Sequence, residues 1–248
     1  ADIYMQQGAQ EASVKRLKEI MSLQSPDREY RLGHFESVVF RDIGFSYEAD
    51  QGNVLQNYNI EIRQGETVAI VGESGCGKST LIKLMAGCIV PGEGEILWNG
   101  VPMERINRQD IYKRAGFLMQ ESTLFNLTIR ENLLFGKADA GEEELRSACV
   151  RANIMDFIQT LDQGWETVIG ENGIKLSGGQ KQRLLIARLL LQDTELIDFD
   201  EATSALDYQN ESEILELLLQ EKGTGKTFVM VTHRGTSVAR CSKVIALQ

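Results

Sequence analysis

Apolar and polar residues alternate along this chain in blocks that predict strands followed by helices. Four mostly apolar runs indicate buried strands of a sheet: residues 67–72, which form a continuous run, and residues 196–200, 227–232 and 243–247. Helical spacing of apolar positions predicts helices over residues 78–86 and 143–161, and another that begins at Ser177. For 143–161 the predicted apolar face comprises Leu145, Cys149, Ala152, Ile158 and Leu161. Strands that alternate with helices imply an α/β protein with a mostly parallel sheet.

The N-terminal region has a different pattern. Residues 5–23 show helical spacing, which the sequence SPD at 25–27 then interrupts, so we expect a connecting helix there. Residues 38–47 and 54–62 are β-like, and the turn-forming stretch ADQGN separates them. This region therefore adds strands of its own before the α/β part.

The composition is that of a globular protein, and it argues against nucleic acid and zinc as partners. Hydrophobic residues make up 42% of the 248 residues, and the net charge of -10 argues against a broad electrostatic grip on nucleic acid. The four cysteines form no C-x-x-C pair and only two histidines occur, so we expect reduced thiols and no zinc site. No apolar run approaches the roughly 18 residues that span a bilayer, and the first residues lack the pattern of a secretory signal. Any membrane-spanning part that works with this protein is therefore expected outside this chain.

Residues 72–79 read GESGCGKS, which matches the phosphate-binding pattern G-x-x-x-x-G-K-[ST]. The glycines permit a loop whose N–H groups wrap a polyphosphate, Lys78 brings a charge to the outer phosphates, and the Ser79 hydroxyl is a ligand for Mg²⁺. An accidental match is the alternative, but the position between a predicted strand and a predicted helix argues against it. We expect ATP and Mg²⁺ as cofactors, with nucleotide contacts from Gly72, Glu73, Ser74, Gly75, Cys76, Gly77, Lys78, Ser79 and Thr80.

Two acids end the predicted strand over residues 196–200. Asp200 is expected to hold Mg²⁺, directly or through water, and Glu201 to act as general base on the attacking water. A solvated turn is the alternative, which the nearby phosphate-binding loop disfavours. Asp198 lies inside the same strand, two residues before Asp200 and so on the same face. A buried carboxylate is costly, so we expect Asp198 to have a partner or to lie at a wet margin.

The sequence LSGGQ at residues 176–180, followed by KQR, and ATSALD at 202–207 complete an ordered set of motifs. With the phosphate-binding loop, this set resembles the ATP-binding-cassette (ABC) family, and the resemblance covers nearly the whole chain from about residue 37. It implies a P-loop NTPase core of the RecA-like kind with a mostly parallel sheet, an N-terminal antiparallel β subdomain and an inserted α-helical subdomain that carries LSGGQ.

The LSGGQ residues also predict a second anion site. Ser177, Gly178 and Gly179 open a helix with free N–H groups, and Gln180 completes a capping-box pattern with Ser177. A simple glycine-rich helix cap is the alternative. In the ABC family two cassettes pack head to tail, and each LSGGQ closes on the nucleotide in its partner's phosphate-binding loop. The resemblance thus implies a second copy of this domain as partner, with an isolated chain monomeric in the absence of ATP.

Four further residues match positions of the family. Tyr47 resembles the aromatic residue that stacks on adenine, although an edge-strand aromatic is the alternative. Gln120 matches the glutamine that senses Mg²⁺, so the implied metal ligands are Ser79, Gln120 and Asp200. Asp207 matches the loop that crosses the dimer interface. His233 matches the switch histidine at the γ-phosphate, which makes Glu201, His233 and Gln120 the implied catalytic set.

Three segments resemble the exporter branch of the family, at residues 11–21, 127–136 and 167–173. They imply that residues 1–24 are the end of a last transmembrane helix with its linker, and that 25–248 are the ATPase domain, with a helical subdomain at about 121–183. The implied function is the ATP-hydrolysing motor of an exporter, joined to a transmembrane domain of the same polypeptide at the cytoplasmic face of the inner membrane. The cargo, and homodimer against heterodimer, stay open.

Two other classes carry the same motifs. A chromosome-maintenance or DNA-repair ATPase has long insertions between the phosphate-binding loop and LSGGQ, whereas only 99 residues separate Lys78 from Ser177 here, and the chain is acidic. A regulatory cassette that binds ATP without hydrolysing it is disfavoured by the presence of Glu201, Gln120 and His233. We therefore expect an active ATPase without a nucleic-acid partner.

Overall fold

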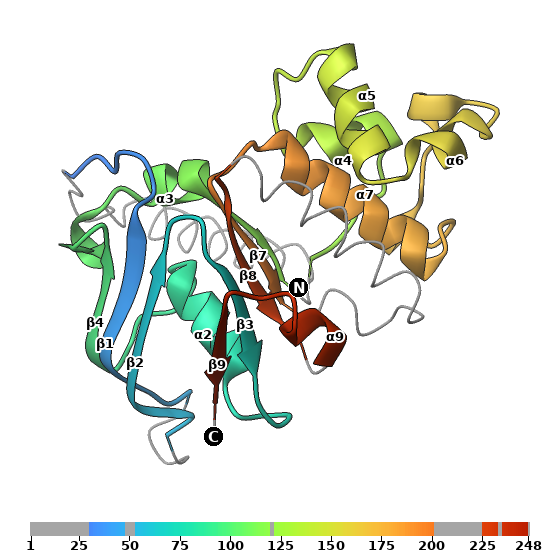
Figure 1. Cartoon of the computed structure of the whole chain (residues 1–248). Helices are drawn as coiled ribbons and strands as arrows, with labels where there is room; N and C mark the ends of the chain where they lie inside the picture. Colours follow the sequence, from blue (N-terminus) through green and yellow to red (C-terminus); the bar gives the residue numbers. More distant parts are fainter. Residues whose placement is uncertain (1–29, 48–52, 120–121, 201–224, 233–234, 248) are drawn as a thin grey trace, which may run out of the picture.

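The computed structural model describes residues 30–47, 53–119, 122–200, 225–232 and 235–247. These residues form two sheets and a helical arm, which extends to one side of the parallel sheet (Figure 1). The predicted helix over residues 5–23, and the segment 1–24 assigned to a transmembrane end and linker, lie outside the described residues.

The first sheet is antiparallel, with the strand order β2-β1-β4-β5. Its strands are β1 (Ser37–Phe45), β2 (Leu55–Arg63), β4 (Glu93–Trp98) and β5 (Val101–Pro102). Val38 lies opposite Ile62 on one side and Trp98 on the other, and all three side chains are buried. The strands predicted over residues 38–47 and 54–62 are therefore confirmed, with ends shifted by one or two residues.

The second sheet is parallel, with the strand order β6-β7-β8-β3-β9. Its strands are β3 (Thr67–Val71), β6 (Ala115–Leu118), β7 (Leu196–Asp200), β8 (Thr227–Val231) and β9 (Lys243–Ala246). The four apolar runs thus form strands of this sheet, as predicted. Because all strands run the same way, their carboxyl ends share one edge, where the phosphate-binding loop leaves β3 and where β7 ends at Asp200.

Alternate side chains of the parallel sheet enter two separate cores. Val68 and Ile70 of β3 pack with the antiparallel sheet and with α2 (Lys78–Met85), which lies between the two sheets in Figure 1. Phe228 and Met230 of β8 point to the other face and pack with the helical arm. Burial on both faces explains why these strands read as continuous apolar runs.

The helical arm consists of α4 (Ile129–Leu134), α5 (Glu142–Arg151), α6 (Met155–Gln159) and α7 (Gly178–Leu191), with short 3₁₀ turns η2 (Gly164–Glu166) and η3 (Glu171–Gly173). The remaining helical elements are η1 (Met103–Arg105), α3 (Arg108–Arg114) and α9 (Gly235–Val238). Among the described residues, every helix is too short or too polar to cross a membrane.

The prediction of a single helix over residues 143–161 is wrong. The chain leaves α5 after Arg151, and Asn153 adopts a positive φ of 52°, before α6 begins at Met155. Asparagine tolerates this left-handed conformation better than most residues, so the break has a local cause that apolar spacing does not reveal. The predicted apolar face is nevertheless buried or partly buried in the core of the arm.

Candidate nucleotide-binding site

The phosphate-binding loop connects β3 to α2. The N-cap of α2 is Gly77, which has a φ of 98° and no side-chain cap, so the first amides of the helix have no partner within it. Gly72 lies where a β-carbon would come within 2.6 Å of Cys76 Sγ and 2.7 Å of the Leu247 carbonyl oxygen. The glycines therefore permit a tight loop around open amide groups, which is the geometry that binds an anion.

Lys78 places its ammonium group inside this loop. The residue is only 5% exposed, and its Nζ donates to the carbonyl oxygens of Gly72 at 3.0 Å and Glu73 at 2.7 Å. The neighbouring residues 73–75 are exposed. The buried ammonium group of Lys78 thus lies behind a loop that is accessible to solvent, and from there it can attract a phosphate group.

Tyr47 lies beside α2, the helix that follows the phosphate-binding loop. Its hydroxyl group and Thr80 Oγ1 share a hydrogen bond of 3.1 Å, and its ring meets Phe45 edge-on with centroids 4.9 Å apart. The side chain is nevertheless 54% exposed. The structure therefore brings Tyr47 together with the predicted phosphate contacts and leaves much of its ring open to solvent.

Strand β7 carries Asp198 and Asp200, and only the first has a described side chain. Asp198 is 0% exposed and pairs with Val229 of β8 and Phe117 of β6 along the sheet. Of the two alternatives expected for Asp198, a partner or a wet margin, the wet margin is wrong, because neighbouring strands and both cores exclude water from the middle of this sheet. The expectation of a partner is the alternative that agrees with this burial. Asp200 ends β7 opposite Val231 of β8, at the edge from which the phosphate-binding loop leaves β3.

The LSGGQ residues begin the signature helix, as we call α7. Ser177 is its N-cap: the Ser177 hydroxyl accepts the Gln180 amide at 3.3 Å, and Gln180 Oε1 accepts the Ser177 amide at 2.9 Å. The predicted capping box is thus confirmed. Ser177 and Gly178 are exposed, so the amides of the first turn face an accessible surface.

The other end of the signature helix packs against the parallel sheet. Gly116 of β6 lies so close to Leu189 that a β-carbon at residue 116 would overlap it. The helix has 14 residues, so its first turn lies about 20 Å from its last residue. The chain therefore has two amide-rich sites, meaning places where backbone amides can bind an anion. One is the phosphate-binding loop in the core, and the other is the first turn of the signature helix on the arm.

Several predicted residues lie outside the described part of the chain. They are Gln120, Glu201, Asp207 and His233. The roles given to these residues, and to the side chain of Asp200, remain predictions. Within the described ranges, no cluster of three or more His, Cys, Asp or Glu side chains could hold a metal ion.

Two residues of the arm, Arg188 and Asn132, were not identified as important from the sequence. Arg188 of the signature helix donates to both the backbone and the side chain of Asn132, which is 0% exposed. Burial lowers the pKa of Arg188 to about 10. A charged residue within an apolar helix face is the only signal that the sequence offers, and it does not identify the partner.

A model of the ABC transporter family matches residues 55–204. The chain is also 39% identical over 211 residues to an ATP-dependent lipid A-core flippase of Chromohalobacter salexigens. This match covers 85% of this chain and 36% of the flippase. It is 37% identical over 241 residues to LktB, a leukotoxin translocation ATP-binding protein of Mannheimia haemolytica, over 95% of this chain and 34% of LktB. The chain thus spans about a third of the length of these curated relatives.

The fold resembles a solved structure described as a bacterial Atm1-family ABC exporter with ATP bound. The TM-score is 0.83 and the sequence identity 37%, over 88% of this chain and 38% of the other. At this identity the likeness extends beyond the arrangement of strands and helices to the amino-acid sequence.

Proposed function

Because this chain belongs to the ABC transporter family, as its ATP-binding domain, we propose that it hydrolyses ATP and drives an exporter as its motor. The observation that carries the proposal is the separation of two amide-rich sites. The phosphate-binding loop precedes α2 in the core, while Ser177 and the signature glycines open α7 on the arm. Both sites suit phosphate oxygens, and they lie on different parts of the chain.

In the proposed complex, the adenine ring stacks on the exposed ring of Tyr47 and the phosphates lie in the loop over residues 72–79. Lys78 is expected to exchange its carbonyl partners for phosphate oxygens, which bind an ammonium group more strongly. The Ser79 hydroxyl and the Asp200 carboxylate are hard oxygen donors of the kind that Mg²⁺ prefers, with Gln120 as a third ligand. The ion would neutralise charge on the phosphates and orient them for attack.

The hydrolytic step is assigned to residues beyond β7. Glu201 follows Asp200 directly, so its carboxylate is expected next to the phosphate-binding loop, where it accepts a proton from the attacking water. His233 and Gln120 would orient the γ-phosphate and that water. These roles are proposed from the resemblance of each position to the motifs of the family.

The position of the signature helix on the arm supports the proposal that a second copy completes the site. Its signature helix is anchored to β6 at the Leu189 end, so Ser177 projects away from the sheet that carries the phosphate-binding loop. A head-to-tail partner would place its own Ser177 against the nucleotide and complete the site. We therefore propose an ATP-dependent dimer, and a monomer when ATP is absent.

The relatives point to the remaining partner. Their greater length, and the permease and translocation functions in their names, support a transmembrane domain attached to this one in the same polypeptide. The domain would then work at the cytoplasmic face of the inner membrane. Because the named cargoes differ between relatives, a lipid and a leukotoxin among them, the choice of cargo is assigned to the membrane part and not to this domain.

A substitution of the general base tests this function. We expect Glu201→Gln to lower ATP turnover about 100-fold or more, while ATP binding persists and a stable dimer accumulates in light scattering. Chelation of Mg²⁺ should stop turnover by the unaltered chain. Lys78→Ala serves as the control, because it should abolish both ATP binding and dimer formation. Undiminished hydrolysis by Glu201→Gln would contradict the assignment.

A further inference from the structure

Arg188 joins the signature helix to two segments that precede it in the sequence. Its Nε donates to the backbone carbonyl of Asn132 at 2.8 Å, its Nη2 to Asn132 Oδ1 at 3.0 Å, and its Nη1 to the carbonyl of Thr123 at 3.0 Å. All three guanidinium nitrogens are therefore bound to oxygen atoms of α4 or of the loop before it.

Asn132 extends this contact into the loop over residues 123–128. Its Nδ2 donates to the carbonyl oxygens of Phe125 and Thr128, both at 3.0 Å, and its Oδ1 accepts the Phe125 amide at 2.9 Å. The side chain is fully buried. Loss of Arg188 would leave a buried amide oxygen with one partner fewer, and would loosen the loop that this amide holds.

The backbones of α4 and the signature helix also meet at this point. A β-carbon on Gly136, which follows α4, would overlap the carbonyl oxygen of Arg188. The Arg188 guanidinium carbon lies 5.9 Å from the ring centre of Phe125 and 5.8 Å from that of Phe135. The arginine is thus enclosed by backbone on one side and by aromatic rings nearby, which restricts its orientation.

The charge of Arg188 is held without an acidic partner among the residues that the structure describes. Its oxygen partners belong to amides, and burial lowers its pKa to about 10, so the group stays cationic at neutral pH. An apolar side chain would fill this position at less cost in desolvation. The guanidinium group instead supplies a rigid, planar set of hydrogen-bond donors, which fixes the directions of its bonds to α4 and to the loop before it. This indicates that Arg188 acts by fixing how these segments are placed.

We propose that Arg188 is a positioning residue that locks α4, the loop over residues 123–128 and the signature helix into one rigid body, so that Ser177 meets the partner's nucleotide in the right place. The inference rests on the proposed head-to-tail dimer. Arg188 comes ten positions after Gly178, or about 15 Å along the helix, so a tilt at Arg188 becomes a displacement at Ser177. Misplacement by about 1 Å is enough to lower a rate 100-fold.

The test compares Arg188→Met with the unaltered chain. Because Arg188 contacts no part of the phosphate-binding loop in its described contacts, the ATP affinity of the monomer should change less than about twofold, whereas kcat should fall about tenfold or more. In the Glu201→Gln background, Arg188→Met should also raise the protein concentration needed for the ATP-bound dimer about tenfold. Arg188→Lys, which keeps the charge but loses the planar fork, should recover only part of the rate.

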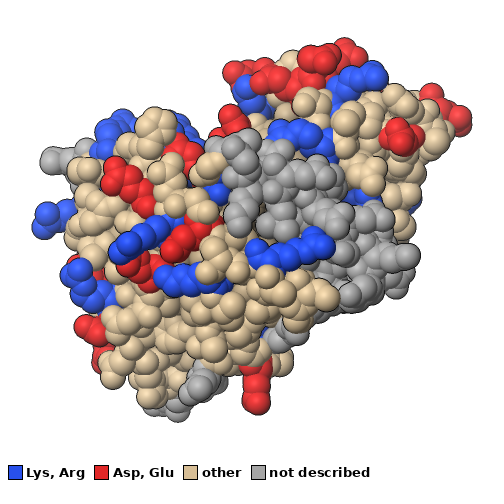
Figure 2. Space-filling model, viewed as in Figure 1, with Lys and Arg blue, Asp and Glu red and all other residues tan. Residues whose placement is uncertain are grey.

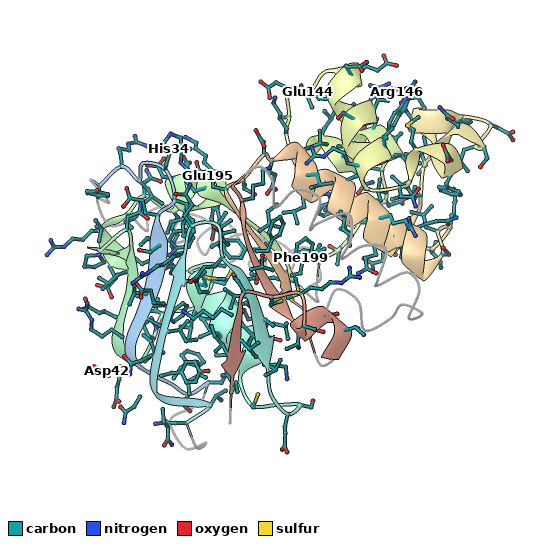
Figure 3. All side chains as sticks on the ribbon, in the orientation of Figure 1. His34, Asp42, Glu144, Arg146, Glu195 and Phe199 are labelled. Carbon is teal, nitrogen blue, oxygen red and sulfur yellow. The ribbon has the colours of Figure 1, made fainter. Side chains whose placement is uncertain are left out.

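Two controls separate the outcomes. Arg146→Met removes an exposed arginine from α5 of the same arm, which points outward in Figure 3, and should leave kcat and dimer formation unchanged. If Arg188→Met does not fold, Arg188→Lys and Arg188→Gln carry the same comparison. Dimer formation and kcat equal to the unaltered chain in a folded Arg188 variant would overturn the inference. Failure of Glu201→Gln to dimerise with Arg188 intact would instead overturn the proposed function.

Discussion

Glu195 and Phe35, 160 residues apart in the sequence, are joined by a hydrogen bond of 2.5 Å from the Phe35 amide to Glu195 Oε2. Glu195 immediately precedes β7, and Phe35 lies just before β1, so the bond fastens the antiparallel sheet to the strand that ends at Asp200. His34 Nδ1 and Arg114 Nη1 donate to the other oxygen of Glu195 at 2.9 and 2.8 Å. Figure 3 shows His34 and Glu195 close together at this junction.

We expect Glu195→Ala to lower the free energy of unfolding by about 2 kcal/mol, because it removes hydrogen bonds to a charged, partly buried carboxylate. Urea unfolding followed by circular dichroism measures the change. The matched control is Glu95→Ala, which breaks the exposed pair with Arg41 and should cost less than about 1 kcal/mol. Equal losses from the two variants would show that Glu195 has no special role at the junction.

The same carboxylate should make stability depend on pH in the acid range. Partial burial opposes ionisation of Glu195, but the Phe35 amide, His34 and Arg114 outweigh it and hold its pKa below the ordinary value of 4.5. Stabilisation by this group is therefore complete above about pH 4.5 and is lost as the pH falls from there through the lower pKa of the folded state. Glu195→Gln should flatten the curve of unfolding free energy against pH in that window. Parallel curves for the two proteins would contradict the prediction.

Gly72 should not tolerate a side chain. A β-carbon there would lie 2.6 Å from Cys76 Sγ and 2.7 Å from the Leu247 carbonyl oxygen, and the loop would have to open. We expect Gly72→Ala to weaken ATP binding about tenfold or more, as measured by titration with a fluorescent ATP analogue. Gly33→Ala is the control, because a β-carbon at residue 33 meets no atom within 4 Å. ATP affinity unchanged in Gly72→Ala would show that the loop can rearrange at little cost.

Most features with a short-range cause could be predicted from the sequence, with the helix break at Asn153 as an exception, and features made by distant contacts could not. The apolar runs, the phosphate-binding loop and the Ser177–Gln180 capping box each depend on residues close together in the chain, and all three are present in the structure. The full burial of Asp198 depends on packing from β6 and β8, which a single strand does not reveal. The bonds between Arg188 and Asn132 join residues 56 apart, and neither residue type specifies the other.

Tyr47 offers a test that separates its ring from its hydroxyl group. If the ring stacks on adenine, Tyr47→Ala should raise the dissociation constant for ATP about tenfold, since stacking of a base on an aromatic ring contributes about 1–3 kcal/mol. Tyr47→Phe keeps the ring and loses only the hydrogen bond to Thr80, so its affinity should stay within about threefold of the unaltered chain. The measurement should be repeated with inorganic triphosphate, which has no base, and there all three proteins should bind alike. If Tyr47→Phe is impaired as much as Tyr47→Ala, the contact that matters is the hydrogen bond to Thr80, and Tyr47 supports the helix behind the phosphate-binding loop instead of contacting adenine.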